Sequence, residues 1–294
     1  MAVACNAVNG VSDLQLVECA TCADAGESDD APGSLPPPKA DSGGNPSKDS
    51  GSDAPVIDAG PTGPSHCQGI TFWAPLEGNG TSAAVSGAKA GETGAGTYVA
   101  EATGKLGQGF RGNAAGATLT WPTPYQGVTA VDPAQGTVAV WIRLNFGNFP
   151  EPKRVWFQPL AGAAATSPAL YLSNTDLVLA AEGGATASVD LSQIPGVLAS
   201  NRPWILAVGT WKAGAVMGST SLGLTVIAPT LTLNGTYKNP WTPGAPPTSF
   251  RLGFNANGGS NASFDELILW DHPLSDADIK TVSELTTPIG QACK

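Results

Sequence analysis

The residues best suited to chemistry lie near the C-terminus, in the stretch Ser-Phe-Asp-Glu-Leu-Ile-Leu-Trp-Asp-His-Pro-Leu-Ser-Asp-Ala-Asp-Ile at positions 263–279. It opens with two adjacent carboxylates, Asp265 and Glu266. Carboxylates can transfer protons or bind hard cations such as Ca²⁺. Residues 264–270 have the composition of a strand, on which neighbouring side chains point to opposite faces. The sequence therefore predicts that these two acids do not act as a catalytic pair.

Other catalytic groups are scarce in the sequence. The two histidines are His66 and His272. A Ser-His-Asp triad would have to use His272, and the Gly-x-Ser-x-Gly turn that exposes many nucleophilic serines does not accompany it. Catalytic zinc sites need several His or Cys ligands, which the sequence does not offer. We therefore expect that this protein is not an enzyme.

The elements around the acidic stretch are predicted to be strands joined by tight turns. Charged residues make up only 13% of the chain, whereas glycine occurs 37 times and proline 25 times. This composition favours an all-β fold with short strands. Strands are expected early in 69–81 and at 136–144, 154–160, 169–173, 176–180, 204–211, 222–226, 230–235, 250–255 and 264–270. After the last strand, Ser275 is expected to cap a short helix.

The charge of the chain excludes two classes of partner. The formal net charge is −10. Nucleic acids and anionic membrane surfaces both attract basic surfaces, so neither is expected as a partner. The sequence contains no run of 18 apolar residues, so we expect no membrane-spanning segment.

An ordered set of motifs runs along the chain. It comprises the opening strand of 69–81, the glycine-rich Gly-Lys-Leu-Gly-Gln-Gly at 104–109, the strand around Trp141, Trp-Ile-Leu-Ala-Val-Gly-Thr-Trp at 204–211, and Phe-Asp-Glu-Leu-Ile-Leu-Trp at 264–270. Taken together they resemble the LamG-like jelly-roll domains of the concanavalin A-like lectin/glucanase superfamily. The resemblance implies an antiparallel β-sandwich. The hairpin around residues 222–235 departs from the family's usual form, so its register is open.

The resemblance has consequences for the ends of the domain and for catalysis. First and last strands of such sandwiches commonly lie side by side. Cys67 and Cys293 bracket these strands, so we predict a disulfide between them. Glycosidases of the superfamily carry Glu-x-Asp-x-x-Glu on one strand, and this triplet does not occur in the chain.

A structural calcium ion is a further implication of the resemblance. Domains of this kind often bind Ca²⁺ through the aspartate of the closing strand, which corresponds to Asp265. Groups near the opening strand, at Glu77 and Asn79, are expected to supply further oxygen ligands. The alternative is that Asp265 accepts hydrogen bonds from backbone amides and caps the end of the strand.

Aromatic residues in proline-rich segments are candidates for ligand contact. Trp121 precedes Pro-Thr-Pro and Tyr125, and Trp241 lies between two prolines. The pattern around them is not that of core strands, and exposed aromatic rings can stack on sugars. The alternative is that these rings cap the edge of a sheet.

The sequence divides into three segments. Residues 1–23 contain Cys5 after Ala-Val-Ala, which resembles the lipid-bearing cysteine of bacterial lipoproteins; the alternative is a free thiol. Residues 24–65 consist mainly of Asp, Ser, Gly, Pro and Ala, and are expected to be a disordered tether. Residues 66–294 form the predicted jelly-roll domain.

Cys19 and Cys22 precede the tether. They lack the βαβ context of a redox Cys-x-x-Cys and the second pair of a zinc site. A local or intermolecular disulfide is expected for them.

These observations favour a non-catalytic binding module on a flexible tether, with a glycan or a surface protein as its partner. Its expected location is extracellular or on the outer surface of a bacterium, with a lipid anchor at Cys5. The first alternative is a structural envelope or surface protein that makes protein–protein contacts. The second is a polysaccharide-cleaving enzyme.

Overall fold

The computed structural model describes residues 63–85, 88–91, 93–112, 117–254 and 260–294. These residues belong to one compact unit, Asp58–Lys294. The expected N-terminal segment with Cys5, and the expected tether up to residue 62, lie outside the described residues. In the part of the chain that is described, no helix is long and apolar enough to cross a membrane.

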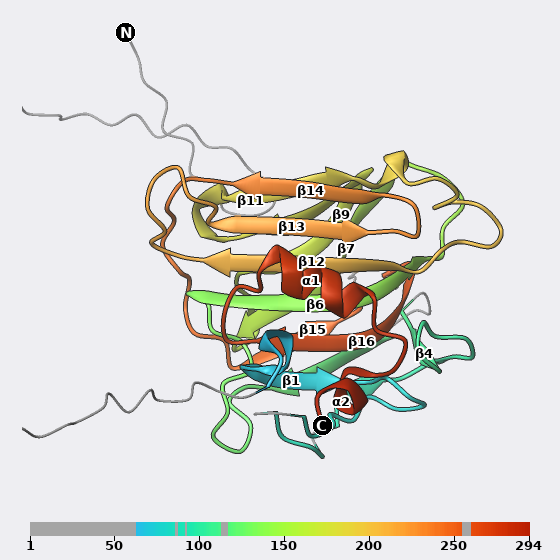
Figure 1. Ribbon diagram of the computed structural model, residues 1–294, viewed down its shortest axis with the longest axis horizontal. Helices are drawn as coiled ribbons and strands as arrows, with labels where there is room; N and C mark the ends of the chain where they lie inside the picture. Colours follow the sequence, from blue (N-terminus) through green and yellow to red (C-terminus); the bar gives the residue numbers. More distant parts are fainter. Residues whose placement is uncertain (1–62, 86–87, 92, 113–116, 255–259) are drawn as a thin grey trace, which may run out of the picture. The chain divides into compact units, whose positions relative to one another are not determined.

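Two antiparallel sheets of eight strands each form a β-sandwich (Figure 1). The first sheet contains, in spatial order, β14 (Thr232–Tyr237), β13 (Leu222–Ile227), β12 (Ile205–Lys212), β6 (Gln135–Leu144), β16 (Ala262–Trp270), β4 (Gly109–Arg111) and β3 (Ala100–Glu101), with β1 (Ile70–Ala74) also paired to β16. The second contains β11 (Thr186–Asp190), β10 (Asp176–Ala180), β9 (Ala169–Asn174), β7 (Glu151–Ala161), β15 (Ser249–Leu252), β5 (Thr118–Pro122) and β2 (Ala95–Thr97), with β8 (Ala164–Ala165) paired to β7.

Short helical segments complete the described structure. They are α1 (Asp276–Ser283), α2 (Ile289–Ala292) and the 3₁₀ turns η1 (Ser65–Cys67), η2 (Glu182–Gly184) and η3 (Leu191–Gln193). The all-β sandwich expected from the sequence is therefore confirmed.

Alternate side chains of both sheets meet in a central core. On β6, Val138, Val140 and Ile142 are wholly buried there. Phe72 of β1 contacts Phe250 of the second sheet edge to face, with ring centroids 4.9 Å apart. Such aromatic contacts add to the burial of apolar surface that holds the two sheets together.

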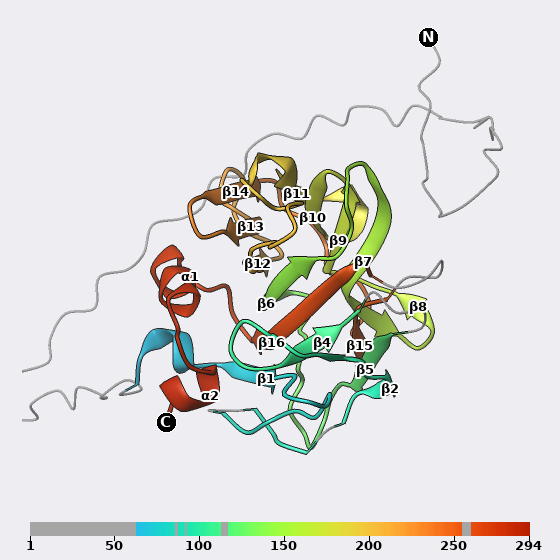
Figure 2. The ribbon, with the colours of Figure 1, turned by 90° about the vertical axis from the view of Figure 1, so that its right-hand side faces the viewer.

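The outer face of the first sheet has a second apolar cluster. Ala139 and Trp141 of β6 point to this face and pack with Ile279 and Val282 of α1. Figure 2 shows α1 and α2 on one side of the two sheets. The helices, and not the second sheet, therefore cover the outer face of β6.

The turn after β16 and the start of α1 agree with the sequence prediction. Ser275 precedes α1, and its hydroxyl accepts a hydrogen bond from the backbone amide of Asp278 at 3.2 Å. Asp276 and Asp278 lie in the first turn, where the helix dipole favours negative charge. The corner therefore fixes where α1 starts on the outer face of the sheet.

The first and last strands pair directly, as expected. Ile70 of β1 is opposite Trp270 of β16. A disulfide joins Cys67 and Cys293, with their Cα atoms 5.4 Å apart, and closes a loop across a separation of 226 residues. The structure thus contains the disulfide that the resemblance implied.

Replacing both cysteines, as Cys67→Ala with Cys293→Ala, is expected to lower the free energy of unfolding by roughly 2–5 kcal/mol, because the bridge restricts the unfolded chain. Denaturant unfolding of the full chain measures the loss. A variant that lacks Cys5, Cys19 and Cys22 is the control and should unfold like the wild type. Equal stability of all three proteins would contradict the prediction.

Candidate functional site

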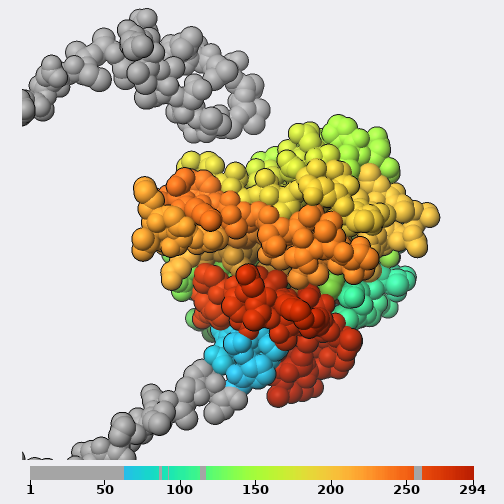
Figure 3. All heavy atoms as spheres, turned by 45° about the horizontal axis from the view of Figure 1, so that its top comes forward, coloured from blue at the N-terminus to red at the C-terminus, as the bar shows by residue number. Residues whose placement is uncertain are grey.

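A groove of about 900 Å³ lies between α1 and the outer face of the first sheet. Figure 3 shows the surface of β13 and β14, in orange, next to that of α1, in red. Strand pairing places outward side chains in three rows across the floor. The rows are Thr210, Gly223 and Thr236; Val208, Thr225 and Asn234; and Leu206, Ile227 and Thr232.

The floor becomes more polar with distance from the helix. Leu206 and Val208 of β12 are buried in the cluster that includes Ile279 and Val282. On β14, the outward residues Thr232, Asn234 and Thr236 are exposed and polar. The eight residues of α1 therefore cover the apolar half of this face and leave the polar half open as the groove.

The groove offers mainly neutral hydrogen-bonding groups. Thr225 donates to the side-chain oxygen of Asn234 at 3.0 Å, which leaves the amide nitrogen of Asn234 to donate elsewhere. Gly223 permits the close approach of Thr210 on the floor, because a Cβ atom at Gly223 would lie 2.6 Å from the Thr210 hydroxyl. On the side of the groove formed by α1, Lys280 forms an ion pair with Glu284. Such a set of groups can bind a polyhydroxylated ligand by hydrogen bonds.

The aromatic residues singled out from the sequence are placed differently. Trp121 was expected outside the core strands, but it lies on β5, is wholly buried and donates to the carbonyl of Gly80 at 2.9 Å. Trp121 is the last residue of β5 whose side chain points into the core, and Pro122 follows it directly. The proline-rich segment therefore begins only after Trp121 and does not keep its ring out of the core. Its ring is not available to a surface ligand.

The other two aromatic candidates lie on loops. Trp241 is 8% exposed and packs with the central core, as expected for a ring that caps the sandwich. Tyr125 is partly exposed, and its hydroxyl accepts a hydrogen bond from Gln126 at 2.8 Å. None of the three lines the groove. Ligand contact by Tyr125 remains a prediction.

A second candidate site is built around the acidic pair of β16. Residue Glu266 has a positive φ of 49°, and the register of β16 against β6 shifts between Asp265 and Ile268. Asp265 is opposite Trp141, and Glu266 accepts a hydrogen bond from Trp73 at 2.8 Å. Both tryptophans belong to the outer apolar cluster. The bulge therefore turns both carboxylates to the same side of the sheet, and the expectation of opposite faces is wrong.

The loop of residues 104–108 encloses two carboxylates. Asp265 accepts from the amide of Leu106 at 2.8 Å, and Glu77 accepts from the amide of Gln108 at 2.9 Å. A Cβ atom at Gly107 would lie 2.1 Å from a carboxylate oxygen of Glu77, so this glycine permits the close approach. Asp265 thus accepts a backbone hydrogen bond, as the alternative expected, but it does so from within β16 and does not cap the end of the strand.

Burial and mutual repulsion control the titration of these acids. Burial raises the pKa of Asp265 to about 7, and the charge of Glu77 adds to the shift. Burial, with the charge of Asp265, raises the pKa of Glu266 to about 8. Among the ion pairs of the described residues, none involves these three acids. The raised pKa values therefore mean that Asp265 and Glu266 retain protons at a pH where exposed carboxyl groups are ionised.

The oxygen atoms at this site fit the chemistry of Ca²⁺. Besides the two carboxylates, the carbonyls of Leu76 and Gly109 lie 2.6 and 2.8 Å from the Tyr98 hydroxyl. Hard cations such as Ca²⁺ prefer carboxylate and carbonyl oxygen. The side-chain oxygen of Asn79 accepts from the amide of Thr81 at 2.9 Å, so it stabilises its own turn.

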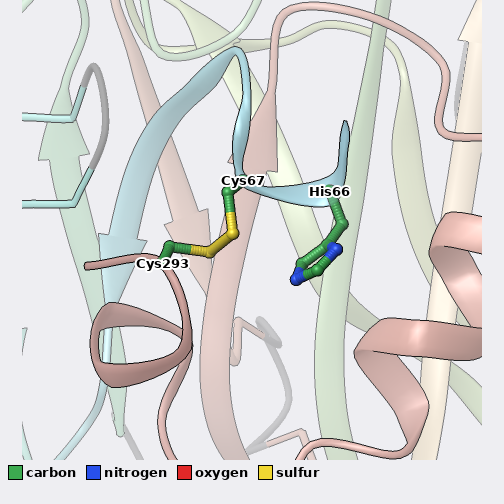
Figure 4. Close-up of side chains that lie close together, drawn as sticks. All are labelled: His66, Cys67 and Cys293. Atoms are coloured by element: carbon green, nitrogen blue, oxygen red, sulfur yellow. A yellow bond between two sulfur atoms is a disulfide. The ribbon is translucent and has the colours of Figure 1, made fainter. Parts of the chain in front are cut away.

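A third group contains ligand atoms of other types. His66, Cys67 and Cys293 bring a ring nitrogen and two sulfurs within 4.8 Å of one another. Figure 4 shows the two sulfurs joined in the disulfide with the His66 ring beside it. Thiolate, and not disulfide, is the form of cysteine that binds metals. The disulfide in this group therefore joins the segment before β1 to the segment after α2.

Known proteins were compared by sequence and by structure. No protein-family model matches the chain, and no curated protein matches it. The sialidase of Trypanosoma rangeli, in complex with sialic acid, is similar in structure with a TM-score of 0.50 and 15% identity, over 74% of this chain and 34% of the sialidase. The botulinum neurotoxin binding domains of serotypes D and C1 both give a TM-score of 0.51 over 74% of this chain.

These comparisons concern architecture. The chain shares a β-sandwich fold with parts of these proteins. The toxin domains are 11% and 8% identical to it, and the matches cover 50% and 52% of their lengths. The chain thus spans about a third of the sialidase and about half of each toxin domain. Identities this low show a shared fold and nothing about shared chemistry.

The raised pKa values predict how stability depends on pH in the presence of a chelator. In the unfolded chain the two acids lose their protons near their ordinary pKa values of 3.8 and 4.5, whereas the folded protein retains them up to about 7 and 8. The folded state therefore binds more protons in this interval, and the melting temperature should fall as the pH rises through it. Calorimetry at several pH values measures the slope.

The variant Glu266→Gln tests the source of this slope. A glutamine at this position cannot ionise, so the decline in melting temperature should be shallower, above all toward the alkaline end of the interval. The exposed acid Glu182, changed to Gln, provides the control and should leave the slope as in the wild type. A slope that is unchanged in Glu266→Gln would disprove the assignment.

Proposed function

We propose that this protein is a non-catalytic carbohydrate-binding module of the LamG-like type, and that its ligand occupies the groove between α1 and β14. One observation carries the proposal. The exposed side chains of Thr232, Asn234 and Thr236, at alternate positions of β14, face polar side chains of α1 across the groove. The hydroxyl and amide groups of these three residues are held at regular intervals along the strand, so they can form hydrogen bonds with successive hydroxyl groups of a saccharide.

Two further observations support binding over catalysis. His272 lies at the corner after β16 and contacts Asp271, 2.7 Å away, at an exposed position outside the groove. The groove wall carries Lys280, Asp276 and Glu284, and Lys280 already pairs with Glu284.

The double variant Asn234→Ala with Thr236→Ala tests the groove. It should weaken the binding of a glycan identified on an array by about tenfold or more, because at least two hydrogen bonds are lost. Isothermal titration with wild type and variant measures the change. Both residues are exposed, so the fold is expected to remain intact.

The control for this experiment is Thr186→Ala, an exposed threonine on β11 of the second sheet. It should bind the array ligand like the wild type. If the groove variant binds as tightly as this control, the ligand occupies another surface and the proposal is wrong.

We also propose that Ca²⁺ binds between Asp265 and Glu77. The variant Asp265→Asn should lose the rise in melting temperature that the wild type shows when Ca²⁺ replaces a chelator, because the ion loses a charged ligand. Differential scanning calorimetry measures the rise, and Glu182→Gln is the matched control. Identical melting of the wild type in Ca²⁺ and in chelator would rule out the site.

A structural role in protein–protein contacts is the second candidate function. Val216 and Met217, in the loop between β12 and β13, are each 78% exposed. Large apolar side chains at such exposure favour a contact with another protein. This function predicts that changing both residues to serine abolishes association with a surface partner and leaves the groove's affinity for glycans unchanged.

The proposed setting is the outer surface of a bacterial cell. Cys5 would carry a lipid, and the Asp-, Ser-, Gly- and Pro-rich residues 24–65 would separate the domain from the membrane. Such an arrangement suits a binding module, because the tether lets the domain reach ligands near the surface.

A further inference from the structure

Arg251 occupies the middle of the outer face of the second sheet. Its neighbours on β15, Phe250 and Leu252, are wholly buried in the central core, so Arg251 points outward. Across the sheet it is opposite Thr120 of β5 and Gln158 of β7. This face lies on the side of the sandwich opposite α1 (Figure 2).

The guanidinium group of Arg251 is held in one orientation. Its Nε and Nη2 atoms both donate to the side-chain oxygen of Gln158, the first at 3.1 Å. Its Cζ atom lies 3.3 Å from the centre of the Phe254 ring. A hydrogen bond along one edge and a ring against one face fix the plane of the group. The remaining edge, formed by Nη1 and Nη2, is aimed away from Gln158.

No carboxylate neutralises this cation within the described residues. Arg111 and Arg143 pair with Glu101, and Arg154 pairs with Glu151, whereas the ion pairs include no partner for Arg251. Partial burial lowers the pKa of Arg251 below its usual value. An ordered, half-buried guanidinium without a counter-ion has a free edge of the shape that binds a carboxylate with two hydrogen bonds.

A second cation and a second aromatic ring lie on the same face. Tyr171 of β9 stands between the buried residues Leu170 and Leu172, so it also points outward. The ammonium group of Lys153 lies 4.1 Å from the centre of the Tyr171 ring. Because the chain carries a net charge of −10, an anion is attracted only where cations gather locally.

We propose that the outer face around Arg251 binds a carboxylate-bearing saccharide, such as a uronic or sialic acid unit. The Nη1/Nη2 edge of Arg251 receives the carboxylate end-on. Thr120 and Gln158 lie beside it to hydrogen-bond sugar hydroxyls, and Lys153 over Tyr171 attracts a second anionic unit. This site is on the other sheet from the groove, and it does not depend on the groove for its function.

Titration calorimetry at about 50 mM salt tests the site with defined probes. Trigalacturonate and 3′-sialyllactose are the acidic probes, and maltotriose and lactose are their neutral counterparts. The groove variant Asn234→Ala with Thr236→Ala, in which the groove no longer contributes, should bind an acidic probe and not its neutral counterpart. Arg251→Gln should weaken this binding by about tenfold or more, since two charged hydrogen bonds are lost. Arg251→Lys keeps the charge without the planar edge and should bind with intermediate affinity.

Lys238→Gln is the matched control, because it changes the net charge equally at an exposed position beyond β14. Lys238→Gln and the groove variant Asn234→Ala with Thr236→Ala should both bind the acidic probes like the wild type. Thermal unfolding confirms that each variant is folded, and Arg251→Lys keeps the test decisive if Arg251→Gln unfolds.

Several outcomes would overturn the proposal. These are equal binding of neutral and acidic probes by the groove variant, wild-type affinity in both Arg251 variants, or no binding of either acidic probe at about 10 mM. Sodium sulfate and sodium acetate serve as competitors. If either simple anion binds as tightly as trigalacturonate, the face is an anion site and the assignment to a saccharide is wrong.

Discussion

The pairing of β16 with strands on both of its edges is the interaction on which the rest of the structure depends. All nine residues of this strand are buried. It pairs with β6 along one edge and with β1 and β4 along the other. The last strand of the chain therefore lies in the middle of its sheet, which cannot be completed until the C-terminal region has folded. The disulfide between Cys67 and Cys293 fastens this arrangement just beyond the paired strands.

The bulge in β16 links this pairing to the acidic site. One extra residue at Glu266 keeps Leu267 and Leu269 in the central core while both carboxylates face the outer side. The loop at 104–108 donates a backbone amide hydrogen bond to Asp265, and the indole of Trp73 donates to Glu266. Gly104 is required for this approach, since a Cβ atom there would lie 2.8 Å from Asp265. The pairing of β16, the bulge at Glu266 and the glycine at position 104 therefore depend on one another.

The sequence predicted the fold better than the sites, for physical reasons. The strand at 136–144 and the helix cap at Ser275 were predicted from local signals. The pairing of Cys67 with Cys293 was predicted from the order of the strands. The structure agrees with all three. Neither the bulge at Glu266 nor the burial of Trp121 could be predicted, because each depends on pairing with distant strands. The predicted strand at 230–235 begins at Thr232 and continues to Tyr237. The groove beside it was missed because it depends on where α1 packs against the sheet.

Covering only one face of the sandwich leaves two chemically different surfaces for ligands. On the first sheet, α1 uses Ile279 and Val282 to cover apolar rows, and the uncovered remainder is neutral and rich in hydroxyl groups. On the second sheet, outward positions carry Arg251 and Lys153 over aromatic rings. A neutral chain of sugars suits the former and an acidic sugar the latter. A polysaccharide with both kinds of unit could contact both sheets only by passing around an edge, so we expect the two surfaces to bind separate chains or separate segments of one chain.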